Sequence, residues 1–171
     1  MIVLFLVTAT ATAAALPSLG APLPAVEIAD VAAGSRRLLP DRHPILVMLE
    51  DKEAQHQNDR ARVVLGHIND SAANRARFEF VAVADVDRWN WWPARRYVLD
   101  DLKAIAEREH TRLFADWSGA LRKAWRLSAH KSVLLLVGAD GKLRFASEGT
   151  VSDEQLAALV AELKALGCAV D

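Results

Sequence analysis

The hydrophobic residues of this chain fall into short, fully apolar runs and longer stretches with helical spacing. An apolar run predicts a strand buried on both faces, and a helically spaced stretch predicts an amphipathic helix. The expected elements are a hairpin turning at Gly34, strands at 45–49, 78–84, 113–115, 132–137 and 142–146, and helices at 53–69, 98–106, 120–127 and 153–166. Because most of these strands alternate with helices, the sequence predicts an α/β protein with a mainly parallel sheet in three α/β/α layers.

The last predicted helix has the clearest ends. Ser152 is followed three residues later by Gln155, which is the pattern of a capping box. An apolar stripe continues to Leu166, and Gly167 occupies the position where a glycine commonly ends a helix. Before this helix, a turn at 138–141 separates two strands, which we therefore expect to pair antiparallel.

The first fifteen residues differ from the rest of the chain. From Ile2 to Ala15 they are uncharged and apolar or small, and they end in T-A-T-A-A-A. This run is shorter than the roughly 20 residues that cross a bilayer, and its small residues suit signal peptidase. We interpret 1–15 as a secretory signal cut near 13–15, which leaves a domain at 16–171 without a membrane span in the periplasm or medium. A buried N-terminal strand or helix is the alternative, since no Lys or Arg precedes the run.

Length and charge limit the possible partners. The chain has 171 residues, enough for one domain with its own core, and its formal net charge is −1. A chain so nearly neutral has little electrostatic attraction for the phosphates of a nucleic acid or for an anionic membrane. The sequence therefore predicts no nucleic-acid partner.

Two motifs near the C-terminus resemble the peroxiredoxin and thioredoxin-like superfamily. The first is an Asp-x-x-Gly step before an aromatic residue, formed by Asp116, Gly119 and Trp125. The second is a strand hairpin with Asp-Gly-Lys at its turn, formed by Asp140, Gly141, Lys142 and Gly149. Within the superfamily, the chain is most similar to the YtfJ-type family of small periplasmic bacterial proteins, over roughly residues 19–166. The resemblance implies a thioredoxin-like fold with an N-terminal β-hairpin and an extra αβ insertion, in the periplasm.

The chain departs from the redox members of that superfamily in two places. Those members carry a cysteine at the start of the helix after the first central strand, where the helix terminus favours a thiolate. The matching segment, 50–58, contains no cysteine. Redox members also carry a cis-proline before the strand that corresponds to 133–137, and Lys131 or Ser132 occupies that position here. The resemblance thus implies a fold without the redox centre, and we expect no catalytic residue and no cofactor.

Cys168 is the single cysteine, four residues from the end of the chain counting itself. One interpretation is an inert thiol on a frayed tail. The alternative is a thiol-disulfide oxidoreductase or peroxiredoxin-like enzyme that uses Cys168 as a free thiol.

Acidic side chains follow two neighbouring central strands. The carboxyl ends of parallel strands meet at one edge of the sheet, so these residues form a candidate groove, composed of Glu50, Asp51, His56, Asp85 and Asp87. Helix caps and turns explain isolated acids equally well, and a metal-dependent hydrolase or sensor on the four carboxylates is a third hypothesis. We predict no metal, because the histidines have no zinc spacing, and His56 is interpreted as a surface residue.

The segment R-W-N-W-W-P-A-R-R-Y is the most unusual stretch of the chain. It supplies a candidate binding loop composed of Trp89, Trp91, Trp92, Arg95, Arg96 and Tyr97. Trp, Tyr and Arg dominate the energetics of protein interfaces. The competing interpretation, which we favour from sequence, is a plug whose tryptophans cover the vacant groove. The predicted function is a non-catalytic binding or accessory protein with an unknown partner in the cell envelope.

Overall fold

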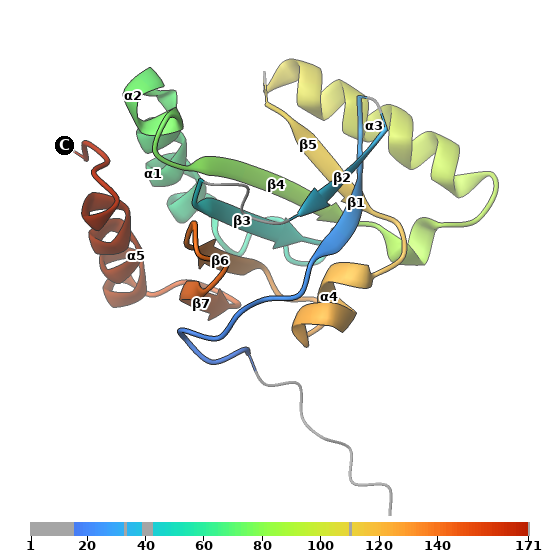
Figure 1. The fold of residues 1–171 in the computed structure, drawn as a ribbon. Coiled ribbons are helices and arrows are strands. Elements are labelled where there is room, and N and C mark those ends of the chain that lie inside the picture. The colour runs from blue at the N-terminus through green and yellow to red at the C-terminus, as the bar shows by residue number, and fades with distance from the viewer. Residues whose placement is uncertain (1–15, 33, 39–42, 110, 171) are drawn as a thin grey trace, which may run out of the picture.

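Seven strands form one sheet in the order β2-β1-β5-β4-β3-β6-β7 (Figure 1). This computed structural model describes residues 16–32, 34–38, 43–109 and 111–170. The strands are β1 (Val26–Asp30), β2 (Ser35–Leu38), β3 (Ile45–Glu50), β4 (Glu79–Asp85), β5 (Leu113–Asp116), β6 (Val133–Val137) and β7 (Leu143–Glu148). The helices are α1 (Asp59–Asp70), α2 (Ala72–Arg75), the 3-10 helix η1 (Asp87–Trp89), α3 (Ala94–Arg108), α4 (Ala120–Trp125) and α5 (Asp153–Ala165).

The predicted thioredoxin-like architecture is confirmed. Strands β3, β4 and β5 are parallel, and β6 and β7 add an antiparallel pair beside β3. The β1–β2 hairpin turns at Gly34, which has a φ of 75°, and pairs with β5 at the other side. Helix α3 and strand β5 are the inserted αβ unit. No helix among the described residues is long and apolar enough to cross a membrane.

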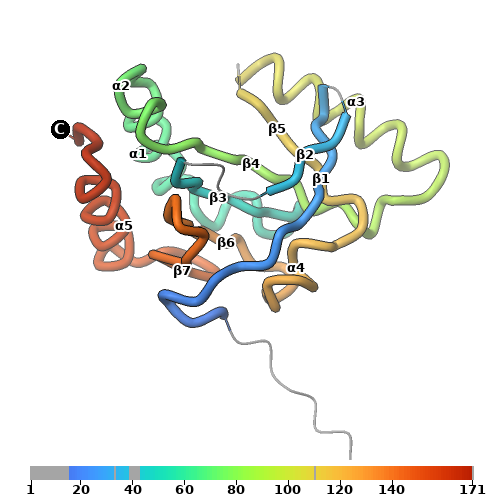
Figure 2. Tube along the Cα trace, viewed as in Figure 1, coloured from blue at the N-terminus to red at the C-terminus, as the bar shows by residue number. Residues whose placement is uncertain are grey.

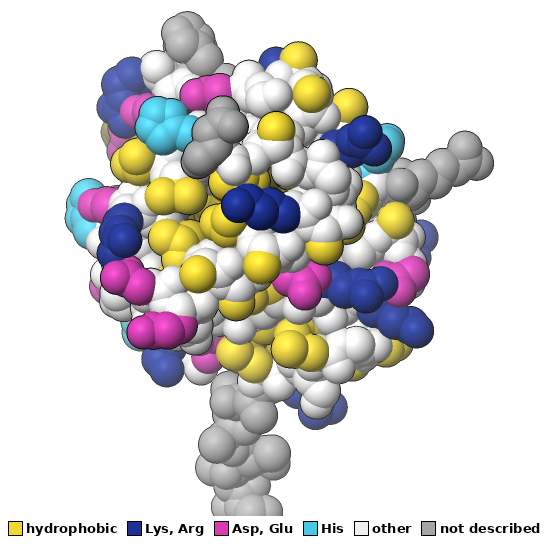
Figure 3. All heavy atoms as spheres, turned by 90° about the vertical axis from the view of Figure 1, so that its left-hand side faces the viewer, with side chains coloured by type: hydrophobic (Ala, Val, Ile, Leu, Met, Phe, Trp, Pro, Cys, Tyr) yellow, Lys and Arg dark blue, Asp and Glu magenta, His cyan; other side chains and the backbone are white. Residues whose placement is uncertain are grey.

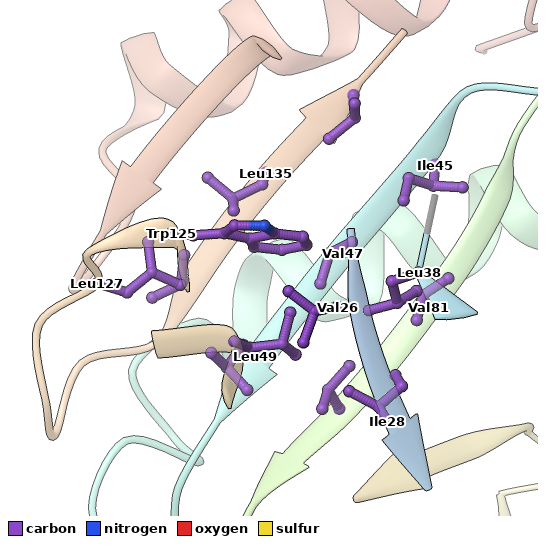
Figure 4. Packing of buried hydrophobic residues seen from close by; sticks show 14 of the residues in the cluster. Val26, Ile28, Leu38, Ile45, Val47, Leu49, Val81, Trp125, Leu127 and Leu135 are labelled. Atoms are coloured by element: carbon purple, nitrogen blue, oxygen red, sulfur yellow. The ribbon is translucent and has the colours of Figure 1, made fainter. Parts of the chain in front are cut away.

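The central strand β3 is apolar throughout because both of its faces are covered. Leu46 and Met48 pack against α1 and α5. Val47 and Leu49 face the other way, toward the β1–β2 hairpin and Trp125 of α4 (Figure 4). The same alternation gives the sheet a core on each face, so the pattern of fully apolar strands correctly indicated a sheet between two layers.

The chain before β1 is fastened to the far edge of the sheet. Figure 2 traces it from residue 16 past β7 and α4 to the hairpin. Pro22 forms a bridge with Lys142, and the Gly20 amide donates to the Leu143 carbonyl at 2.7 Å. The described chain from residue 16 on is therefore part of the folded domain, whereas the proposed signal at 1–15 lies outside the described residues.

The first predicted helix begins later than its apolar spacing indicated. We expected a helix at 53–69, but α1 begins at Asp59 and residues 52–58 form turns. The Asp51 carboxylate accepts the Ala54 amide at 2.9 Å, which turns the chain locally instead of letting it continue as a helix. The short helix α2 was not predicted, because four residues carry no helical period.

The capping box on α5 is confirmed and leads to a first testable prediction. Ser152 Oγ accepts the Gln155 amide at 3.2 Å, and Gln155 Oε1 accepts the Ser152 amide at 3.0 Å. Replacing Ser152 with alanine is expected to lower the free energy of unfolding by about 1 kcal/mol, because an orphan amide of the first turn loses its acceptor. Urea unfolding followed by circular dichroism measures this change. An unchanged midpoint would show that solvent replaces the cap at no cost.

Candidate functional site

The carboxyl ends of the parallel strands surround a shallow hollow of ≈ 290 Å³. Its lining residues are Asp51, Asp85, Asp87, Arg88, Arg122, Ala129 and His130. Three of the predicted groove residues, Asp51, Asp85 and Asp87, are therefore brought together. The other two are not part of this lining. Glu50 points to the α1 side, and His56 is a surface residue whose Nδ1 lies 3.2 Å from Asp59 Oδ2.

Arg122 of α4 neutralises much of the acidic charge in the hollow. Its guanidinium donates to Asp85 Oδ2 and to the carbonyl oxygens of Ser128 and Lys131, and it lies 3.8 Å from Asp51 Oδ2. Only 10% of its side chain is exposed. The sequence analysis missed Arg122, because a single arginine on a short helix carries no signal of where it points.

The Asp85 carboxyl group is buried beside Arg122, and its two oxygens have different surroundings. Burial raises the pKa of Asp85, and the hydrogen bond from Arg122 opposes that rise. Its Oδ2 accepts a hydrogen bond from Arg122, whereas its buried Oδ1 has no hydrogen-bond partner among the described residues. A buried carboxylate with one free oxygen is destabilising, so the Arg122 contact is the main compensation for placing Asp85 there.

The structure also shows which residues could hold a metal ion. Asp51, Glu53 and His130 place one ligand atom each within 4.8 Å of one another. However, Asp51 Oδ2 already accepts the His130 amide at 3.1 Å and lies 2.9 Å from His130 Nδ1. The positive charge of Arg122 stands beside the same oxygen. This geometry gives the metal hypothesis little support, since a cation would have to displace those contacts.

Two amide side chains occupy the start of α1, where the resemblance places the redox thiol. Gln57 Oε1 accepts the Ser132 amide at 3.0 Å, and Gln57 Nε2 donates to the His130 carbonyl at 3.2 Å. Asn58 Nδ2 donates to Ser132 Oγ at 2.8 Å and to the Gly149 carbonyl at 2.9 Å. We call Gln57 and Asn58 the amide clasp. It ties the beginning of α1 to the segments before β6 and after β7 with neutral hydrogen bonds.

Ser132 connects the amide clasp to Glu50 at the end of β3. Ser132 Oγ donates to Glu50 Oε1 at 2.7 Å, and Arg62 donates to Glu50 Oε2 at 2.5 Å. Burial raises the pKa of Glu50, and these two donors oppose the rise. Ser132 is fully buried, so it is a structural link and not an accessible nucleophile. The cis peptide bond among the described residues is Trp92–Pro93, so none occurs at the position of the cis-proline of redox members.

The tryptophan-rich segment does not plug the hollow, and our favoured interpretation of it was wrong. Trp91 is 55% exposed, Trp92 is 87% exposed and Tyr97 is 67% exposed. Only Trp89 packs inward, against the small core under α3. The reason is that arginines line the hollow instead, and α3 begins at Ala94, immediately after the loop, which projects outward. We call Trp91, Trp92 and Tyr97 the aromatic tip.

The two arginines of this segment behave differently from each other. The Arg95 guanidinium lies over the Trp117 ring, 4.8 Å from its centroid, and donates to Asn90 Oδ1 at 2.8 Å. Arg96 is exposed, and its side chain forms no ion pair or hydrogen bond with the part of the chain that the structure describes. Arg95 therefore fastens the loop to the domain, while Arg96 is available to a partner.

Cys168 is not on a frayed tail, contrary to one of our interpretations. The residue is 6% exposed and packs with α1 and α5, and Asn74 fastens the next residue, Ala169, with bonds of 2.8 and 2.9 Å. Burial raises the pKa of the Cys168 thiol, and Arg77 opposes the rise. The Arg77 charge that acts on this thiol comes from a residue just before β4 begins, whereas Asp85 of the hollow is the last residue of β4. Cys168 therefore lies at the opposite end of the sheet from the hollow.

Charge is evenly mixed on the side of the molecule that carries the C-terminus. Figure 3 shows acidic and basic side chains interspersed among hydrophobic ones on this face. Such a mixture produces no extended field of one sign there.

Comparisons with known proteins agree with the fold. Residues 96–166 match the family described as "Bacterial protein of unknown function (YtfJ_HI0045)". The search of curated proteins found no match. A putative thiol:disulfide interchange protein DsbE from Chlorobium tepidum is 16% identical in sequence, with a TM-score of 0.63. The match covers 88% of this chain and 99% of that protein's chain.

Two further solved structures are similar. A thiol peroxidase from Chromobacterium violaceum is 13% identical with a TM-score of 0.62, over 88% of each chain. The exposed lipoprotein thioredoxin Etrx1 of Streptococcus pneumoniae is 13% identical with a TM-score of 0.58, over 83% of this chain and 99% of that one. Identities this low establish the fold alone. The family match covers residues 96–166, less than half of the chain, so the chain has a thioredoxin-like fold and is similar to the YtfJ-type family over its C-terminal part.

Proposed function

We propose that this protein is exported and acts by binding another protein of the cell envelope rather than by thiol chemistry. The observation that carries the proposal is the amide clasp. Gln57 and Asn58 stand where a redox relative needs its thiol, and their side chains are occupied by hydrogen bonds to the segments before β6 and after β7. Neutral amides neither attack a disulfide nor reduce a peroxide.

Export is supported by the sequence before the domain. The apolar segment 1–15 ends in small residues, as a secretory signal does. The description of Etrx1 as an exposed lipoprotein shows that this fold also occurs outside the cytoplasm in another species. Both observations agree with a periplasmic or secreted domain that begins near residue 16.

The aromatic tip is the surface that we assign to the partner. An 87% exposed tryptophan is costly in water, because its large apolar area gains free energy only when it is covered. Trp91 and Tyr97 are also exposed and lie within five residues of Trp92 along the chain, and Arg96, beside Tyr97, adds a guanidinium without a partner among the described residues. Exposed aromatic residues gathered with arginine are the typical composition of an interface hot spot.

Crosslinking capture from cell envelopes tests this proposal. The bait is residues 16–171, compared with a Trp91→Ala/Trp92→Ala variant, and Trp89 is left unchanged because it packs inside. A partner is expected to be captured by the unaltered protein and lost by about tenfold or more in the variant, since hot-spot truncations weaken binding by at least that factor. The matched control is Val63→Ala, another exposed apolar residue, on α1 (60% exposed). Equal capture by all three baits would refute the role of the tip.

The alternative function is a thiol enzyme that uses Cys168, and it would require catalytic activity that depends on this residue. We expect the reduced protein to show no catalytic reduction of insulin disulfides and no catalytic consumption of hydrogen peroxide. We also expect Cys168 to react with iodoacetamide at neutral pH at least tenfold more slowly than a free cysteine, because it is buried and its thiol pKa is raised. Catalysis that disappears in Cys168→Ser would instead establish the enzyme.

A further inference from the structure

The surface around the aromatic tip has a defined distribution of charge. The segment from Arg88 to Tyr97 contains three arginines and no acidic residue. Arg88 is paired with Glu53, and Arg95 is held by Asn90 and the Trp117 ring. Arg95 keeps its charge, because both of its partners are neutral, but its guanidinium is engaged. The guanidinium of this segment that is left to bind a partner is therefore that of Arg96.

One helical turn farther along α3, the charge changes sign. Asp100 and Asp101 are exposed and follow Arg96 and Tyr97 at a spacing of four residues, which places each above its predecessor on the helix surface. Neither carboxylate forms an ion pair with another described residue. The exposed face of α3 thus carries Arg96 followed by Asp100 in one row, and Tyr97 followed by Asp101 in the next row.

We propose that this surface binds a polypeptide segment that presents one acidic residue among apolar ones, an inference that rests on the proposed binding function. A carboxylate of the segment pairs with Arg96, and its neighbouring apolar side chains cover Trp91 and Trp92. The planar guanidinium accommodates a carboxylate with two parallel hydrogen bonds. The aromatic rings supply the apolar area that a single ion pair lacks.

The two aspartates discriminate between kinds of anionic partner. A uniformly negative surface, such as an anionic membrane or a polyanionic chain, would bring further negative charge against Asp100 and Asp101 as soon as it reached Arg96. A polypeptide avoids this repulsion, because it can carry one acidic residue at Arg96 and a neutral or basic residue opposite the aspartates. The alternation of charge along α3 therefore favours a peptide over a lipid surface or an anionic glycan.

Selection from a random peptide library on immobilised residues 16–171 tests the inference. We expect the selected peptides to carry one Asp or Glu next to apolar residues, with neutral or basic residues at the positions that face Asp100 and Asp101. The Arg96→Glu variant is expected to lose the acidic selection and to bind the best acidic peptide at least tenfold more weakly by fluorescence anisotropy. Arg108→Glu is the matched control, since it makes the same charge change near the other end of α3 and should leave the selection unaltered.

The possible outcomes separate this inference from the function on which it rests. Acidic selection that is lost in Arg96→Glu and kept in Arg108→Glu supports the inference. Selection without acidic enrichment, enrichment that Arg96→Glu leaves unchanged, or binding to phosphatidylglycerol vesicles instead of peptides overturns it. If envelope capture still depends on Trp91 and Trp92 while Arg96→Glu has no effect on capture, the binding function stands and the acidic partner falls. If neither the Trp91→Ala/Trp92→Ala variant nor Arg96→Glu affects capture, both the binding function of this surface and the acidic partner are refuted.

Discussion

Replacing Trp125 with alanine is expected to lower the free energy of unfolding by about 4 kcal/mol, the largest effect that we predict for a single substitution. Trp125 is 2% exposed and lies between the β1–β2 hairpin and β6, near Val26, Val47 and Leu135 (Figure 4). Its removal leaves a large cavity between two layers that cannot close without moving α4. The indole Nε1 also donates to the Pro24 carbonyl at 2.9 Å, and that acceptor would lose its partner.

The same substitution at an exposed tryptophan provides the control for Trp125→Ala. Trp92→Ala is expected to change the free energy of unfolding by less than about 0.5 kcal/mol, because Trp92 is 87% exposed. Urea titrations followed by far-ultraviolet circular dichroism compare the two variants under one condition. A similar midpoint for both would contradict the packing of the hairpin and α4 around Trp125.

The second large effect is expected at Asp116, whose replacement by alanine should lower the free energy of unfolding by about 3 kcal/mol. Asp116 is 1% exposed at the end of β5. Its Oδ1 accepts the amides of Ser118 and Ala120 at 3.2 and 3.0 Å, and its Oδ2 accepts the Leu121 amide at 2.8 Å. Without the carboxylate, these amides at the start of α4 are left without acceptors inside the fold.

The destabilisation at Asp116 has a graded test. Asp116→Asn keeps the shape and one acceptor oxygen, so its loss should be smaller than that of Asp116→Ala. The control is Asp140→Ala, an exposed turn residue that accepts the Lys142 amide at 3.1 Å, with an expected loss below about 1 kcal/mol. If Asp116→Asn were as destabilising as Asp116→Ala, lost charge rather than lost acceptors would explain the effect.

The sequence motif that contains Asp116 correctly predicted the fold, but it did not show what the motif residues do in the structure. The Asp-x-x-Gly step indicated the superfamily. The structure shows what the step does: Asp116 caps α4, and Gly119 adopts a φ of 65° so close to the Asp87 carboxylate that a Cβ would lie 2.8 Å from Oδ2. A residue other than glycine would have to displace the Asp87 carboxylate and adopt a left-handed backbone, so the motif meets a local requirement of the turn.

What the sequence determined by itself was most of the elements and their layers, although not the short helix α2 or the start of α1. The run from Ile45 to Leu49 is apolar at every position, and such a run is stable only between two covering layers. Ser152 and Gln155 mark the start of α5 through bonds between residues three apart. These are local or periodic features, and local chemistry and period are visible in a sequence. The missing thiol in 50–58 was equally visible, because it concerns the presence of a residue type.

Only the tertiary structure decided the candidate site. Arg122 meets Asp85 across 37 positions, and Asn58 meets Ser132 across 74 and Gly149 across 91. Nothing in the sequence indicates pairs so far apart, because their distance depends on how every intervening element packs. The exposure of Trp91 and Trp92 has the same origin: composition favoured burial, but the arginines that line the hollow and the start of α3 at Ala94 left those rings in solvent. A sequence specifies which side chains are available, whereas packing decides which of them meet each other and which face outward.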